Sequence, residues 1–245
     1  MIRRLALLLL LAAPAWAGPP DLSGIEWTDR TGALLPMAMP LTGADGADTT
    51  LGTVADGRPL ILAPGYFHCP SLCSVVRADL LGALAASRLR AGTDVSVAVL
   101  GIDPAEGPAD ARAAREGGEA RWPGAHYLTG DSVAVQDAAG FRARFDPELK
   151  QFLHPAGLVV VSPDGRVAGY LGGVGYAPAQ LEAAVARARG GPLEPASLVR
   201  LLCFHFDPAT GRYTLAVERL VQAAFLLTAV VVGALLWRSH RRGTP

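Results

Sequence analysis

The sequence predicts an α/β domain in which a central mixed sheet carries helices on both faces. Two apolar runs, at residues 60–67 and 95–100, flank a long amphipathic segment and so form a β-α-β unit. Further helical segments and a short strand follow, and a β-hairpin and a last helix close the domain. The order β-α-β, helices with a short strand, then β-β-α suits an open sheet that is covered on both sides.

The first unit contains a strand over residues 60–67, a helix from Leu72, and a strand over residues 95–100. In the helical segment, apolar residues recur at three- and four-residue spacing, which is typical of an amphipathic helix. We expect Gly92 to end this helix near Arg90. A strand–helix–strand crossover of this kind makes the two strands parallel, with a right-handed connection.

The later elements follow from caps, breakers and alternating patterns. Asp131 is expected to cap one helix that runs to Gly140, and Pro178 to open the last one. The turn Ser162-Pro163-Asp164-Gly165 separates the two strands of the hairpin. The predicted ranges are helix 108–116, strand 125–128, helix 131–140, strands 158–161 and 167–171, and helix 178–189.

The region before the first strand is expected to be an irregular extension. Residues 18–58 are rich in Gly, Pro, Asp and Thr, and contain only short apolar pieces. At most one small hairpin is expected there. The α/β domain is therefore predicted over residues 59–190.

Both ends of the chain carry targeting signals. Residues 1–17 combine a basic start, a short apolar core and the sequence Ala15-Trp16-Ala17, which indicates a secretory signal peptide. Residues 220–237 are apolar except for Gln222 and Thr228, and a basic tail follows at 238–245. This pattern predicts a transmembrane helix with a cytoplasmic tail, joined to the domain by a linker over 191–219. A buried core helix is the alternative.

These signals place the predicted domain in the periplasm, held at the inner membrane by a single C-terminal pass. The 22 basic and 22 acidic residues give a net charge of zero. No basic cluster interrupts the predicted domain, which argues against nucleic acid as a partner.

Two cysteines follow the first strand in the stretch Gly65-Tyr66-Phe67-His68-Cys69-Pro70-Ser71-Leu72-Cys73. Pro70 suits the first turn of a helix, so Cys69 lies at the helix start and Cys73 one turn later. Residues four apart on a helix have Cβ atoms about 5–6 Å apart. The pair can therefore close into a redox-active disulfide or bind one soft metal ion, and a helix N-terminus favours the thiolates that both reactions need.

A structural disulfide is the alternative, since many exported proteins contain one. However, a bridge across three intervening residues closes a very small loop and constrains the unfolded chain little.

His154 is the best candidate for a third metal ligand. It stands in Phe152-Leu153-His154-Pro155, immediately before the hairpin. In the predicted sheet this position lies beside the strand that carries the thiol turn. Two thiolates and one imidazole suit Cu(I) in trigonal geometry and can also hold Cu(II). A histidine next to a proline can equally be an ordinary loop residue.

Three other residues have open roles. Cys203 and His205 form a Cys-x-His pair that suits an accessory copper site, although a buried thiol in an aromatic segment is the more common case. Asp103 either lies close to the metal site or forms the turn after the second strand.

Several motifs resemble those of the Sco/SenC family of copper chaperones for cytochrome c oxidase assembly. They are the Cys-Pro-x-x-Cys stretch, Gly101-Ile102-Asp103-Pro104, Leu128-Thr129-Gly130-Asp131, and His154 followed by Val161-Ser162-Pro163-Asp164-Gly165-Arg166. The resemblance implies a thioredoxin-like fold and one copper ion bound by Cys69, Cys73 and His154. One departure is Ser74, where many members have a second proline.

The resemblance also implies a function and partners. It predicts a copper chaperone whose partner is the copper-bearing subunit of cytochrome c oxidase, and leaves open whether another copper chaperone loads it. The alternative is a thiol-disulfide reductase that acts on the cysteines of the oxidase, with Cys69 as the attacking thiolate. A third hypothesis is a peroxide-reducing protein with a sulfenic acid intermediate.

Overall fold

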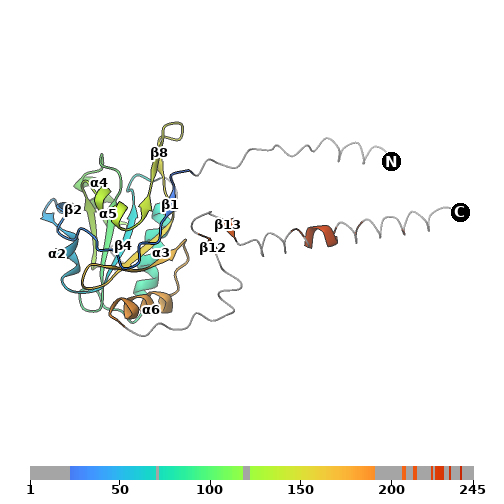
Figure 1. Ribbon diagram of the computed structural model, residues 1–245. Coiled ribbons are helices and arrows are strands. Elements are labelled where there is room, and N and C mark those ends of the chain that lie inside the picture. The colour runs from blue at the N-terminus through green and yellow to red at the C-terminus, as the bar shows by residue number, and fades with distance from the viewer. Residues whose placement is uncertain are drawn as a thin grey trace.

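The computed structural model describes residues 23–69, 72–117 and 122–190, and also residues 206–207, 212–213, 222, 224–228, 232 and 238. Most of the strands and helices lie in the first three ranges (Figure 1). In chain order the elements are β1 (Glu26–Trp27), β2 (Leu41–Gly43), β3 (Asp48–Thr49), α2 (Leu51–Ala55), β4 (Leu60–Gly65), α3 (Leu72–Ala85), β5 (Ser96–Gly101), α4 (Pro108–Glu116), β6 (Ala125–Thr129), α5 (Val133–Ala138), β7 (Phe141–Arg142), β8 (Arg144–Asp146), β9 (Gln151–Leu153), β10 (Gly157–Val161), β11 (Val167–Gly172), α6 (Pro178–Ala188), β12 (Phe206–Asp207) and β13 (Arg212–Tyr213).

The central sheet has seven strands in the order β11-β10-β4-β5-β6-β2-β3. β4, β5 and β6 are parallel to one another. β10 pairs antiparallel with both β4 and β11, and β2 pairs antiparallel with β6 and β3. The predicted mixed sheet, its parallel β4-α3-β5 unit and its hairpin are therefore confirmed.

Side chains alternate in direction along each strand, so the apolar residues of the core are divided between the two faces of the sheet. In β4, Leu60 and Leu62 join the cluster that contains residues of α2 and α5. Ile61 and Ala63 point the other way, into the cluster with α3 and α6. Helix α4 packs on this second face too, because its Ala111 lies in a cluster with Val99. Helices thus cover both faces, as predicted.

The central strands are buried along their whole length, since every residue of β4 and β5 is buried. Strands covered on both faces read as continuous apolar runs, which is why they could be predicted. Helix α3 ends earlier than predicted, at Ala85 instead of near Arg90. The Ser87 hydroxyl donates a hydrogen bond to the carbonyl of Leu84 (2.7 Å), and this bond closes the end of the helix.

Much of the predicted irregular extension over residues 18–58 belongs to the core, so this prediction was wrong in extent. Leu35, Leu41 and Leu51 are buried. β2 and β3 form a small hairpin at the edge of the main sheet, and α2 covers one face. Each of these elements has two to five residues, too few for a hydrophobic period to be recognised.

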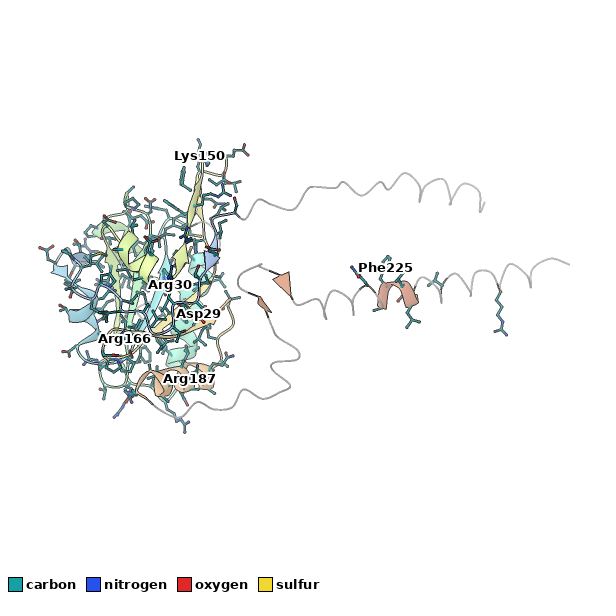
Figure 2. All side chains as sticks on the ribbon, in the orientation of Figure 1. Asp29, Arg30, Lys150, Arg166, Arg187 and Phe225 are labelled. Carbon is teal, nitrogen blue, oxygen red and sulfur yellow. The ribbon has the colours of Figure 1, made fainter. Side chains whose placement is uncertain are left out.

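The segment between Gly140 and His154 contains three strands that the sequence pattern did not reveal. β7 pairs with β1, which ties the N-terminal segment to the domain. β8 and β9 form a hairpin that projects from the domain, with Lys150 at its tip (Figures 1 and 2). This hairpin leads directly into His154.

The described residues do not support the predicted transmembrane helix. No helix among them has both the length and the apolar character needed to cross a bilayer. The range 220–237 lies largely outside the described part of the chain, and the predicted signal peptide lies wholly outside it. Within the predicted linker over 191–219, the four described residues form the antiparallel pair of β12 and β13.

Gly140 should be essential for the attachment of the N-terminal segment. Its φ is +70°, and a Cβ atom there would lie 1.9 Å from the carbonyl oxygen of Thr28. We expect Gly140→Ala to lower the free energy of unfolding by about 2 kcal/mol or more, because the substitution combines an unfavourable φ with a clash against backbone. Chemical denaturation measures this change. Gly172→Ala, where a Cβ would contact nothing within 4 Å, is the matched control and should be close to neutral.

Candidate metal centre

The candidate centre lies at the carboxyl end of β4, where the chain turns into helix α3. The thiol loop, defined as residues 66–69, follows the strand, and the helix begins at Leu72. Residues 70 and 71 lie outside the described part of the chain, so the predicted place of Pro70 is not described. β5 runs parallel to β4 and ends beside it, with Gly65 opposite Gly101. Loops that follow neighbouring parallel strands lie at the same edge of the sheet, where binding sites commonly form.

The structure brings Cys73 and His154 into direct contact. Cys73 lies in the first turn of α3 and is 3% exposed. Its Sγ atom is 2.9 Å from Nε2 of His154, which follows β9 and is partly buried. Two of the three predicted ligands, 81 positions apart in the sequence, thus meet at one point.

Hydrogen bonding determines the tautomer of His154. Its Nδ1 atom is 3.0 Å from the carbonyl oxygen of Pro155. A carbonyl can only accept, so Nδ1 carries the hydrogen and the lone pair of the neutral ring is on Nε2, facing Cys73. Burial lowers the pKa of His154, which keeps the ring neutral. This is the form of imidazole that binds a metal ion, oriented as metal-binding histidines usually are.

Cys69 precedes α3, which begins at Leu72 and not at Cys69 as predicted, and it is more accessible than Cys73. Its Sγ atom accepts a hydrogen bond from the backbone N–H of Cys73 (3.4 Å). Both residues are thiols in the structure. Burial, together with the neighbouring Cys69 thiol, raises the pKa of Cys73 to about 12. Among the described residues, no group of three or more His, Cys, Asp or Glu side chains forms a complete metal site.

The two thiols lie in a small apolar cluster of their own. Tyr66, Cys73, Ile102 and Phe141 are its buried members, and Cys69 and Phe152 are among the partly buried residues around them. The His154 ring lies 5.7 Å from the ring of Phe141 and 6.1 Å from that of Tyr66. Burial raises the pKa of Tyr66 to about 12, and the two cysteines add to this shift. The surroundings are therefore poor in water, which strengthens any bond between a metal ion and these ligands.

Glu106 is a residue at this edge that the sequence pattern did not reveal. It follows β5, and its side chain is 1% exposed. The carboxylate oxygen Oε1 accepts hydrogen bonds from the backbone N–H groups of Phe67 (2.6 Å) and His68 (2.8 Å). Burial raises the pKa of Glu106, and these two hydrogen bonds partly offset the shift. An acidic residue three positions after Asp103, at the end of the neighbouring strand, is a signal that could have found it.

The other candidate residues have roles away from the thiols or lie outside the description. The ring of His68 faces two carboxylates, with Nδ1 3.3 Å from Glu106 and Nε2 3.2 Å from Asp110. Asp103 forms the turn after β5, where its side chain accepts from the N–H of Ala105 (2.8 Å). Cys203 and His205 lie outside the described residues.

Comparison with known proteins identifies relatives of this chain. The family model described as SCO1/SenC matches residues 37–189. A search of curated proteins finds no significant match. Among solved structures, a proposed electron transfer protein from Aquifex aeolicus VF5 is 25% identical with a TM-score of 0.62, over 68% of this chain and 99% of that chain.

Two structures of copper-bound ScoI proteins share the fold. ScoI from Arabidopsis thaliana has a TM-score of 0.53 at 19% identity, over 65% of this chain and 99% of that chain. ScoI from Bradyrhizobium japonicum has a TM-score of 0.50 at 22% identity, over 66% of this chain and 99% of that chain. The family model covers more than half of the sequence, and its range coincides with the domain that contains both thiols and His154. The chain therefore belongs to the SCO1/SenC family.

Proposed function

We propose that this protein is a copper chaperone that binds one copper ion through Cys69, Cys73 and His154 and delivers it for assembly of the copper centre of cytochrome c oxidase. The observation that carries the proposal is the 2.9 Å contact between Cys73 Sγ and His154 Nε2, with Cys69 four residues before Cys73. Two sulfur donors and one nitrogen donor suit copper in either oxidation state. Copper is the cargo of this protein, so it has to bind and also leave.

The three donors differ in how easily another protein can reach them. Cys73 is buried, whereas Cys69 and His154 are partly exposed. Copper binding requires Cys73 to lose a proton that its surroundings hold tightly, so binding releases protons. We infer that Cys69 is the donor that an acceptor protein replaces first, while Cys73 and His154 keep hold of the ion during the exchange.

The solved structures of relatives support copper as the bound metal, and the sequence at the two ends of the chain supports the proposed location. The ScoI proteins of Arabidopsis thaliana and Bradyrhizobium japonicum share the fold and were solved with copper bound. The sequence of residues 1–17 and 220–237 supports export and retention at the inner membrane, with the domain in the periplasm. The copper-bearing subunit of the oxidase is the proposed acceptor.

Replacing His154 tests the copper proposal. We expect the purified full-length protein to bind one Cu(II), and His154→Ala to weaken that binding by more than about 100-fold, because changes around a metal ligand alone already cost about 10–100-fold. Competition titration and the visible absorption spectrum measure both effects. His126→Ala removes a histidine on β6 and should leave binding unchanged. Full affinity and an unchanged spectrum in His154→Ala would contradict the assignment.

The arrangement of the thiols also favours a second candidate function, a thiol-disulfide reductase. A partly exposed thiol followed by a buried one is suited to attack and resolution. The Cys69 thiolate would attack a substrate disulfide and form a mixed disulfide. Cys73 would then attack Cys69, releasing the reduced substrate dithiol and leaving a Cys69–Cys73 disulfide. This reaction needs no imidazole, so reductase activity should survive His154→Ala and be lost in Cys69→Ser.

The thiols should differ strongly in reactivity. Treatment of the reduced protein with limiting iodoacetamide between about pH 7 and 9 should modify Cys69 and spare Cys73, since the Cys73 thiol is buried and has a pKa of about 12. Peptide mass spectrometry locates the adduct. Denatured protein is the control, in which both residues should react. Preferential modification of Cys73 in the folded protein would rule out the proposed order of attack.

The proposed location is tested by inserting alkaline phosphatase, which is active only after export, after residue 190, with residues 191–245 retained behind it. We expect an active enzyme that sediments with inner membranes. Deleting residues 220–245 should release the activity into the periplasmic fraction if that segment is the anchor. Activity confined to the cytoplasm would exclude the proposed location.

A further inference from the structure

A buried carboxylate lies beneath the thiol loop, outside the proposed ligand set. Oε1 of Glu106 accepts hydrogen bonds from two successive backbone N–H groups, those of Phe67 (2.6 Å) and His68 (2.8 Å). Both bonds hold the chain immediately before Cys69. Its other oxygen, Oε2, is buried and has no hydrogen-bond partner among the described residues. Burying a carboxylate is unfavourable unless it is well hydrogen-bonded, so the two N–H groups of the loop are the contacts that stabilise the charge of Glu106.

The loop after β5 is built to hold Glu106 in this place. The backbone N–H of Glu106 donates to the carbonyl of Asp103 (3.1 Å), in the turn that the Asp103 side chain also stabilises. Gly101 leaves the necessary space, because a Cβ there would lie 3.2 Å from the Phe67 ring and 3.5 Å from Oε2 of Glu106. The neighbouring Gly107 N–H donates to Asp110 at the start of α4 (2.8 Å). Hydrogen bonds of Glu106 itself and of the next residue, Gly107, thus hold the backbone at Glu106 in place.

The contacts of His68 on the outside of the loop are a weaker restraint. His68 is in contact with Glu106 and Asp110, but its side chain is 67% exposed. Ion pairs that face solvent contribute little to a fixed geometry. The hydrogen bonds that the backbone donates to the buried Glu106 side chain are therefore the contacts that determine the path of the chain into Cys69.

We propose that Glu106 is a positioning residue, which fixes the backbone of residues 67–68 and thereby directs the Cys69 thiol toward Cys73 and His154. This inference rests on the proposed copper-binding function. Without the carboxylate, two partly buried N–H groups lose their acceptor and the loop can adopt other paths. Cys69 would then spend less time where it can share a metal ion, or a disulfide, with Cys73.

The test compares Glu106→Ala and Glu106→Gln with Asp110→Asn in the full-length protein. Glu106→Ala should weaken Cu(II) binding by about 10–100-fold and alter the sulfur-to-copper absorption bands, as loss of support around a metal ligand does. Glu106→Gln keeps an acceptor oxygen, so its spectrum should match that of the unmodified protein, with affinity reduced only a few-fold. Asp110→Asn removes the charge that faces His68 and keeps an oxygen that can accept from the Gly107 N–H, so it should behave like the unmodified protein. Wild-type affinity and spectrum in Glu106→Ala would overturn the inference.

A second readout separates this inference from the copper proposal. The equilibrium of the Cys69–Cys73 couple with glutathione should shift at least tenfold in Glu106→Ala, which corresponds to about 30 mV. If the unmodified protein bound no copper, the copper proposal would fail. The shift in the glutathione equilibrium would then test the positioning role of Glu106 without a copper measurement. If Glu106→Ala did not fold, Glu106→Met, which fills the same space without an acceptor oxygen, would decide, and an affinity and a glutathione equilibrium equal to those of the unmodified protein would overturn the inference.

Discussion

The site depends on the antiparallel pairing of β10 with β4. Leu62 of β4 lies opposite Val159 of β10, so the beginning of β10 lies at the carboxyl end of β4. His154 comes three residues before β10, and Cys73 lies in the first turn of the helix that follows β4. Because the strands run in opposite directions, a residue that precedes one strand meets a residue that follows the other. The contact between imidazole and thiol is a consequence of this pairing.

The same edge of the sheet supplies the surroundings that give these groups their chemistry. Apolar side chains from β1, β7 and β9 close around the pair, and burial keeps both Cys73 and His154 uncharged in the reduced protein. Cys69 remains partly exposed. A soft metal ion would therefore displace the proton of the buried Cys73 thiol. It would remain accessible to another protein on the side of Cys69. This asymmetry serves copper transfer and thiol exchange equally well, since both reactions begin at Cys69.

Much of the fold could be predicted because the central strands are long and continuously apolar. β4, β5 and β10 are buried on both faces, and the helices between them carry periodic apolar residues or clear caps. The edge elements could not be predicted. β2, β3, β7, β8 and β9 have two or three residues each, which is too short for a hydrophobic period. β2 and β7 also pair with β6 and β1, which are far away in the sequence. Helix α3 ends earlier than predicted, and the Ser87 hydroxyl and backbone N–H both donate to the carbonyl of Leu84 at its end.

The sequence by itself determined which chemical groups are available. The spacing of Cys69 and Cys73 is a local property of one helical turn, and His154 is marked by its place before a recognisable hairpin. Only the tertiary structure decided which groups meet, because contact across 81 positions requires β10 to lie beside β4. It also decided that Nε2 of His154 faces Cys73, since that depends on a hydrogen bond to Pro155. The parallel alignment of β4 and β5 was predicted, but the hydrogen bonds of Glu106 beneath the thiol loop depend on how the two loops after these strands fold, which only the tertiary structure shows.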